Sequence, residues 1–345
     1  MSSLGGYYIV RSEDFVYNPR ISNSAPVGPI NRNKLGRIGV MSPLYTVFRP
    51  HDIDTTYLEY FFKSKYWHSF MNFNGDSGAR SDRFSIKDSV FFEMPIPIPH
   101  IDEQKKIGAF LDKLDSLITL HQRKYDKLTK VKKAMLEKMF PENGSPYPEI
   151  RFKGFTDAWE QHKLGEFADI VGGGTPSTSN FEYWDGDIDW YAPAEIADQI
   201  FVSSSERKIT QQGYDNSSAK MLPVGTVLFT SRAGIGKTAI LRKEGCTNQG
   251  FQSIVPHINE LDSYFIFSRS EEMKRYGETV GAGSTFVEVS GKQMANMELM
   301  MPTTMEEQVT IGSFFRNLDS IITLHQRKLE KLKNIKKACL EKMFV

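Results

Sequence analysis

The chain has 345 residues, of which 40% are hydrophobic, and a formal net charge of +1 from 43 basic and 42 acidic side chains. This length is sufficient for two domains with separate cores, and the balanced charge gives no general attraction to phosphates, so charge alone is a weak argument for nucleic-acid binding. The two cysteines form no disulfide framework, and we find no secretory leader and no apolar stretch of membrane-spanning length, so we expect a cytoplasmic protein of a prokaryotic cell with no membrane association.

Residues 1–100 are expected to form a first globular domain. Aromatic and β-branched residues between turn residues favour short strands, and an amphipathic stretch favours a helix. The strands are expected at Phe15–Tyr17, Tyr45–Phe48 and Val90–Met94, and the helix at Thr55–Phe70. Pro95–Pro99 predicts an extended connector, because each proline disfavours helix in the residue before it.

Residues 101–141 and 305–345 are predicted to form two long helices, because one sequence occurs twice. Glu103–Phe140 and Glu307–Phe344 are identical at 25 of 38 positions, at a constant offset of 204. Apolar residues recur in both copies at intervals of three and four, which is typical of one helix face.

A single amphipathic helix of this length would expose its apolar face, so we predict that the two helices pack together as an antiparallel coiled pair. A histidine on the apolar line of each copy is expected to fix the register rather than to bind a metal ion. The predicted core of the pair consists of Ile107, Leu114, Leu117, His121, Leu128, Met135, Ile311, Leu318, Ile321, His325, Leu332 and Cys339.

A second globular domain is predicted at residues 150–304, after a linker that is rich in proline and turn residues. Strands are expected at Val224–Thr230 and Ser253–Pro256, and a helix at Leu261–Tyr276. The two globular segments resemble each other faintly, as in Gly78-Ala79 and Gly281-Ala282. The fold class is therefore α+β, with two mixed α/β domains, two long helices and an approximate two-fold relation.

The order of these segments and their duplication resemble the specificity subunits of type I restriction-modification enzymes. The residues that carry the resemblance are Pro97, Pro99, Glu103-Gln104, Ile107 and Leu114-Asp115, their repeats at Pro302, Glu307-Gln308, Ile311 and Leu318-Asp319, and in the second domain Trp159-Glu160, Lys163–Glu166 and Gly225–Gly236. The resemblance covers nearly the whole chain.

The resemblance implies that each globular domain is a target recognition domain for one half of a split sequence in double-stranded DNA. It also implies that the helices set the gap and dock two methyltransferase subunits, which act with motor-nuclease subunits. This chain would be non-catalytic and hold no cofactor or metal, and S-adenosylmethionine, ATP and Mg²⁺ would belong to the partners. In the second domain a long stretch separates Trp159 from the strand at Thr226–Phe229, whereas the counterpart Asp14–Tyr17 comes almost at once. The first domain therefore looks shortened, and its DNA reading is the more doubtful of the two.

Polar and basic loop residues are the candidates for DNA contact, because arginine and lysine bind phosphates and arginine also reads guanine. They are Arg32, Lys34, Arg80, Arg83, Thr175, Ser177, Arg232, Lys237 and Ser284. Gly234–Thr238 resembles a nucleotide-binding loop, but Ser231 stands where that loop needs a glycine, so we interpret it as a β-turn. The sequence shows no catalytic triad, zinc-ligand spacing or methyltransferase motif.

Two other interpretations remain. The chain could be a structural protein, a coiled-coil scaffold with two protein-binding heads, which the acidic composition of the second domain favours. It could also be an inactive shortened variant of a specificity subunit, or a recombination partner of one.

Overall fold

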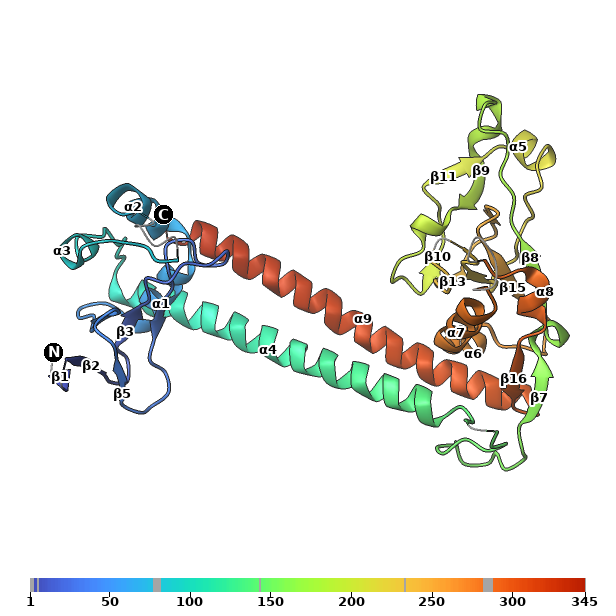
Figure 1. The fold of residues 1–345 in the computed structure, drawn as a ribbon, viewed down its shortest axis with the longest axis horizontal. Coiled ribbons are helices and arrows are strands. Elements are labelled where there is room, and N and C mark those ends of the chain that lie inside the picture. Colours follow the sequence, from blue (N-terminus) through green and yellow to red (C-terminus); the bar gives the residue numbers. More distant parts are fainter. Residues whose placement is uncertain are drawn as a thin grey trace. The chain divides into compact units, whose positions relative to one another are not determined.

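The computed structural model describes residues 3–4, 6–76, 82–142, 144–232, 234–281 and 288–344. Contacts divide the chain into two compact units (Figure 1). Unit 1 comprises Met1–Asp126 with Leu324–Val345, and unit 2 comprises Lys127–Thr323. Each unit thus combines one globular head with parts of both long helices. Our division of the chain into four segments separates heads from helices and stays a prediction.

The head of unit 1 contains two small antiparallel sheets. One has the order β1-β2-β5, with strands Ser3–Leu4, Tyr7–Val10 and Gly39–Met41, and the other has the order β4-β3-β6, with strands Ile30–Arg32, Phe15–Tyr17 and Thr46–Phe48. The helices are α1 (Thr55–Lys63), α2 (Tyr66–Asn74), α3 (Asp88–Phe91) and the beginning of α4 (Ile101–Lys138). An aromatic core fills the space between the second sheet and these helices.

The head of unit 2 is built around a five-stranded sheet of order β10-β13-β12-β15-β8. Its strands are Phe201–Val202, Thr238–Leu241, Val227–Phe229, Gln252–Pro256 and Ala168–Gly172, and only the β10–β13 pair is parallel. A second sheet joins β9 (Trp184–Tyr191) to β11 (Arg207–Ile209) and β14 (Cys246–Thr247), and a third joins β7 (Glu160–Lys163) to β16 (Glu298–Met301).

The helices of unit 2 are α5 (Gln211–Asp215), α6 (Ser263–Ser268), α7 (Ser270–Gly281), α8 (Gly291–Ala295) and the beginning of α9 (Met305–Lys342), with short 3₁₀ turns at Leu164–Glu166, Phe181–Tyr183 and Pro193–Glu195. A large apolar core lies between the central sheet, α6, α7 and the two long helices. In the part of the chain that the structure describes, no helix combines the length and apolarity needed to cross a membrane.

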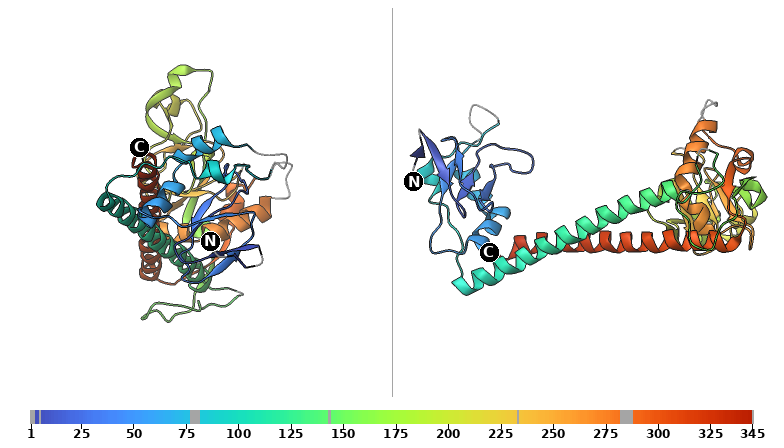
Figure 2. Two further views of the ribbon diagram at one scale, coloured as in Figure 1. Left: turned by 90° about the vertical axis from the view of Figure 1, so that its left-hand side faces the viewer. Right: turned by 90° about the horizontal axis from the view of Figure 1, so that it is seen from below.

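The two long helices confirm the prediction from the repeat. Their bounds, Ile101–Lys138 and Met305–Lys342, lie at the same offset of 204 as the sequence repeat. In unit 1 the beginning of α4 lies beside the end of α9, and in unit 2 the end of α4 lies beside the beginning of α9, so the pairing is antiparallel (Figures 1 and 2).

Most of the predicted helix-pair core is buried or half-buried. Leu114, Ile311 and Leu318 are buried, and Ile107, Leu117, His121, Leu128, Met135, His325, Leu332 and Cys339 are half-buried. The prediction for Ile321 is wrong, because this side chain is 45% exposed. Its neighbour Ile322 is half-buried instead, which continues the spacing of four and three from Leu318 to His325.

Three local predictions are also corrected. Val90–Met94 is not a strand, because residues up to Phe91 belong to α3. The helix predicted at Thr55–Phe70 divides into α1 and α2, because Ser64 is extended and its backbone N–H caps α1. The helix predicted at Leu261–Tyr276 divides at Arg269, whose buried guanidinium bonds to Met300 O and Glu272.

Both heads dock on the helices through the same residues of the repeat. The side-chain oxygen of Gln104 accepts the backbone N–H of Asp54, the N-cap of α1, at 2.9 Å, and Gln308 accepts that of Asp262, the N-cap of α6, at 3.1 Å. These bonds join each head to the beginning of the helix that follows it.

An aspartate in each long helix then joins its head to the other helix. In unit 1 Asp115 accepts the hydroxyl of Tyr60 at 2.8 Å and pairs with Lys336. In unit 2 Asp319 accepts that of Tyr264 at 2.9 Å and pairs with Lys132 at 2.6 Å. Each head is therefore fixed to both helices.

A phenylalanine at the end of each repeat completes the contact. Phe344 is 1% exposed and packs against Tyr57 and Phe61 of α1. Phe140 is 8% exposed and packs against Phe265 of α6. Figure 2 shows the end of α9 against the helices of unit 1.

Candidate nucleic-acid interface

Loops far apart in the sequence meet at one end of the central sheet of unit 2. The antiparallel register places the end of β8 opposite the beginning of β15, through the pair Gln252↔Gly172, and the end of β12 opposite the beginning of β13, through Phe229↔Thr238. Loops 173–180, 230–237 and 247–251 therefore leave the sheet at the same end, which we call the loop end of unit 2.

Hydrogen bonds join these loops directly. The Thr175 hydroxyl bonds to the side-chain oxygen of Gln249, and Ser231 N donates to Gly250 O at 2.8 Å. Arg232 forms a β-bridge with Glu288. Four of the predicted DNA contacts, Thr175, Ser177, Arg232 and Lys237, thus lie in loops at the loop end.

The turn that carries Arg232 and Lys237 is the hairpin connection between β12 and β13. Gly234 and Gly236 have φ angles of 106° and 96°, which favour glycine, and the buried Thr230 hydroxyl donates to Gly234 O at 2.7 Å. The interpretation of this segment as a turn is confirmed. Lys237 is exposed and Arg232 is half-exposed, so both cations lie at the protein surface.

Two tryptophans of β9 hold the loop that carries Thr175 and Ser177. The indole of Trp190 donates to Gly174 O at 2.8 Å, and that of Trp184 donates to Ser177 O at 3.2 Å. The Arg207 guanidinium lies 3.6 Å from the centre of the Trp184 ring, in cation–π geometry. The backbone of this loop is thus fixed, while the Ser177 side chain is exposed.

Asp189, between these tryptophans in β9, is fully buried. Burial alone would raise the pKa of its carboxyl, but hydrogen bonds from Lys243, the Ser205 backbone and Lys208 outweigh burial and lower the pKa. The resulting carboxylate ties β9 to β11 and to the segment before β14. This ion-pair cluster therefore supports the scaffold behind the loop end.

Unit 1 repeats the arrangement of hairpin loop and neighbouring segment. Arg20, in the loop between β3 and β4, forms a β-bridge with Arg83, as Arg232 does with Glu288 in unit 2. Phe84 N donates to Pro19 O at 2.7 Å, and the Arg20 side chain is 74% exposed. Sequence reasoning singled out Arg83 but missed Arg20, although both lie beside turn residues.

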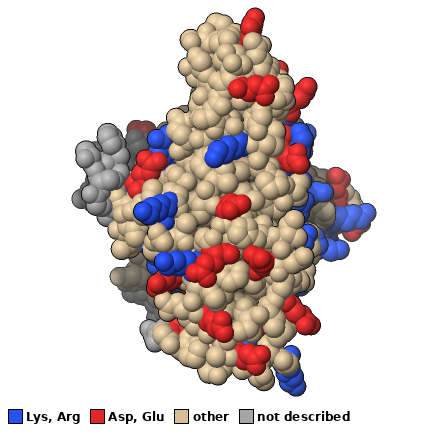
Figure 3. Space-filling view, turned by 90° about the vertical axis from the view of Figure 1, so that its right-hand side faces the viewer, with Lys and Arg blue, Asp and Glu red and all other residues tan. Residues whose placement is uncertain are grey.

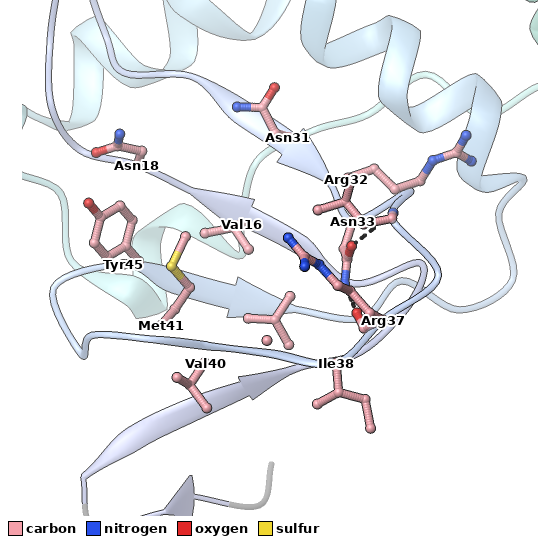
Figure 4. Close-up of a pocket in the computed structure, with 13 residues that line it drawn as sticks. Val16, Asn18, Asn31, Arg32, Asn33, Arg37, Ile38, Val40, Met41 and Tyr45 are labelled. Atoms are coloured by element: carbon pink, nitrogen blue, oxygen red, sulfur yellow. Dashed lines mark hydrogen bonds between the residues drawn. The ribbon is translucent and has the colours of Figure 1, made fainter.

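Arg32 and Lys34 lie at the other end of the β3–β4 hairpin. The Arg32 side chain is only 6% exposed, and it bonds to Glu59 at 2.8 Å and to the Thr55 hydroxyl at 2.8 Å. Figure 4 shows it directed away from a groove of about 550 Å³ between the two sheets. The structure therefore argues against DNA contact by Arg32, because its guanidinium is buried in an ion pair.

Lys34 is half-exposed and also pairs with Glu59, at 3.2 Å. Burial would raise the pKa of Glu59, but Lys63, Lys34 and Arg32 outweigh it and lower the pKa. Lys34 is thus part of this internal cluster rather than of the surface around Arg20.

Two predicted contacts, Arg80 and Ser284, lie outside the described residues. Gly281 and Glu288, which flank the second of these gaps, are close together, because a Cβ on Gly281 would lie 3.2 Å from Glu288 O. Through its bridge to Arg232, Glu288 belongs to the loop end. Among the described residues, no group of three or more His, Cys, Asp and Glu side chains is arranged to hold a metal ion.

Known proteins share both sequence and fold with this chain. The family model described as "Type I restriction modification DNA specificity domain" matches residues 8–130 and 156–334. The MjaIX specificity subunit of Methanocaldococcus jannaschii is 34% identical over 190 residues, which cover 54% of this chain and 44% of the relative. The EcoR124I/EcoR124II specificity subunit of Escherichia coli is 27% identical, over 75% of this chain and 65% of the relative. The chain therefore spans about half to two thirds of the length of these relatives.

Solved structures show that the fold is shared as well. The HsdS subunit of Thermoanaerobacter tengcongensis is 20% identical, with a TM-score of 0.52 over 97% of this chain and 81% of that one. The type I S subunit of M. genitalium is 12% identical, with a TM-score of 0.63 over 97% and 84%. Since the family model covers both heads and most of both long helices, the chain belongs to the family of type I restriction-modification specificity subunits.

Proposed function

We propose that the chain is the non-catalytic DNA-recognition subunit of a type I complex in the prokaryotic cytoplasm. Each head reads one half of a bipartite duplex target. The helices α4 and α9 set the spacing and dock two methyltransferase subunits, and motor-nuclease subunits join the assembly. S-adenosylmethionine, ATP and Mg²⁺ act on those partners.

The observation that carries this proposal is the loop end of unit 2. It combines two surface cations, Arg232 and Lys237, with the hydroxyl side chains of Thr175 and Ser177 on loops with a fixed backbone. Arginine and lysine bind phosphates and fix the register on the duplex, while hydroxyl and amide groups supply hydrogen bonds to base edges. A rigid surface with both kinds of group suits recognition of a specific sequence.

Salt-dependent binding of the full chain to duplex DNA tests the proposal. Each lost phosphate contact should reduce the slope of log K against log salt by about 0.9. The double substitution Arg232→Gln and Lys237→Gln should therefore flatten the slope by about 2. The matched control is Lys133→Gln on α4, whose side chain is 81% exposed, and it should leave the slope unchanged. Affinity that does not vary with salt would refute DNA recognition.

Docking is tested by co-purification with the cognate methyltransferase subunit, followed by mapping of methylated adenines. We expect a stable complex, and a modified sequence that changes when residues 150–304 are exchanged for those of a relative. A complex that does not form, or a modified sequence that is insensitive to the exchange, would contradict this role.

A coiled-coil scaffold with two protein-binding heads is the second candidate. Figure 3 shows basic and acidic side chains interspersed on one face of unit 2, without a continuous basic band over the residues it describes. Such a surface also suits protein partners, whose interfaces combine charges of both signs. Failure of the wild-type chain to bind duplex DNA at low salt would favour this candidate.

A further inference from the structure

The carboxamide of Gln249 is a prominent polar group of the loop end that the sequence did not single out. Its side chain is exposed, although the residues on both sides are anchored. Asn248 N donates to Tyr191 O at 3.0 Å, and Gly250 N donates to the side-chain oxygen of Asn248 at 2.8 Å. The backbone of Gln249 is therefore fixed, and its side chain extends from a rigid turn.

The Thr175 hydroxyl fixes the orientation of this carboxamide. A hydroxyl can donate to an amide oxygen, so its bond to Oε1 of Gln249 distinguishes the oxygen from the nitrogen. The two donor hydrogens of Nε2 remain available, and Oε1 keeps a second lone pair. The group thus presents a donor and an acceptor side by side, in an orientation set before any ligand binds.

This donor–acceptor pair matches one base edge in the major groove. Adenine presents an acceptor at N7 beside a donor at N6, and glutamine or asparagine binds both at once. Guanine presents two acceptors, and cytosine presents a donor at N4. The carboxamide therefore discriminates in favour of adenine, and Arg232, whose neighbour Ser231 bonds to Gly250, lies close enough along the chain to contact a flanking phosphate.

We infer that Gln249, oriented by Thr175, reads one adenine in the half-site bound by unit 2. The inference rests on the proposed function, because it requires the loop end to face duplex DNA. In unit 1 the residue corresponding to Gln249, two positions before the aromatic residue that precedes β6, is Pro43. Proline has no side-chain donor or acceptor, so the two heads read different bases at this place and the whole target is asymmetric.

The test is selection of bound sequences from a randomised duplex pool by the full chain, with sequencing of the enriched DNA. Loss of a bidentate contact to adenine costs about 5- to 100-fold in discrimination at one base pair. Gln249→Ala should lower the preference for A·T at one position by this factor and leave the remaining positions unchanged. Thr175→Val should lower it at the same position to a smaller extent, because the carboxamide remains but is no longer oriented.

Gln249→Glu gives a change of preference rather than a loss. A carboxylate only accepts hydrogen bonds, so it should favour cytosine N4 at the same base pair. The matched control is Gln161→Ala on β7, which removes the same exposed group far from the loop end in sequence and leaves its partner Glu298 exposed. It should leave all positions unchanged.

The possible outcomes separate the inference from the proposed function. If wild type and Gln249→Ala select the same sequence, the assignment of Gln249 is wrong while DNA recognition stands. If the base pair that Gln249→Ala relaxes is G·C, the assignment to adenine is wrong. If the wild-type chain enriches no sequence from the pool, the proposed function and the inference both fail.

Discussion

Replacement of Phe344 by alanine should destabilise unit 1 alone. An aromatic side chain buries about 150–250 Å², which corresponds to about 4–6 kcal/mol at 25 cal/mol per Å², and buried Phe→Ala substitutions cost about 3–5 kcal/mol. Because Phe344 is 1% exposed and packs against Tyr57 and Phe61, we expect a loss of about 4–5 kcal/mol. This is a large fraction of the stability of a typical domain.

Hydrogen exchange measured by mass spectrometry locates the effect. Phe344→Ala should accelerate exchange in α1 and α2, while peptides from α6 and α7 keep their wild-type rates. Phe140→Ala is the reciprocal variant and should accelerate exchange in α6 rather than in α1. Phe73→Ala is the control, because that side chain is 89% exposed and its loss should change stability by less than about 0.5 kcal/mol. Equal acceleration in both heads by either core substitution would refute the reasoning that each phenylalanine closes one head.

Three further predictions concern the helix pair and the loop end. His121 and His325 bond through Nδ1 at 2.8 Å, and burial followed by the charges of His121, Lys124 and Lys328 lowers the pKa of His325; the folded state therefore binds fewer protons, so thermal stability should fall as pH decreases below about 6.5, and His325→Leu should remove this pH step. A melting temperature that is independent of pH between 7 and 5 would contradict it. Asp189→Asn should cost about 1–3 kcal/mol, because Lys208 and Lys243 lose their buried partner but remain partly hydrated, and limited proteolysis should then cut first near β9 and β11; wild-type resistance would argue against this ion-pair cluster. Gly173→Ala should lower the melting temperature by several degrees and weaken DNA binding, because its Cβ would lie 2.1 Å from Asn248 O, whereas Gly172→Ala, with its nearest atom at 3.6 Å, should be nearly neutral; equal effects of the two would show that the loop adapts.

The repeat predicted more of the fold than local patterns did. Its constant offset gave both long helices and their antiparallel pairing, because two similar apolar faces in one chain cover each other. The same identity contained the docking residues, since Gln104, Asp115 and Lys336 recur as Gln308, Asp319 and Lys132, but sequence alone does not show that a polar residue conserved between repeats contacts a head. The breaks at Ser64 and Arg269 were missed because they depend on caps and tertiary hydrogen bonds rather than on periodicity.

The candidate interface was only partly predictable, for a related reason. Thr175, Arg232 and Lys237 were identified as polar or basic loop residues, but their convergence follows from the strand order β12-β15-β8, which places three loops at one end. Arg32 has the same local character as Arg20, and only the position of Glu59 in α1 decides that Arg32 is buried. Gln249 gave no signal, because an isolated glutamine in a loop is usually solvated.

The composition of unit 1 has a consequence for the order of events during synthesis. Its core includes Leu324–Val345 as well as Met1–Asp126, so the ribosome completes all of unit 2 before the first head acquires its last contacts. Until then Tyr57 and Phe61 lack the ring that covers them, and closing this long loop costs chain entropy. The nascent first head should therefore be a substrate for chaperones and proteases for nearly the whole time of translation, whereas unit 2 can close soon after its own last strand emerges.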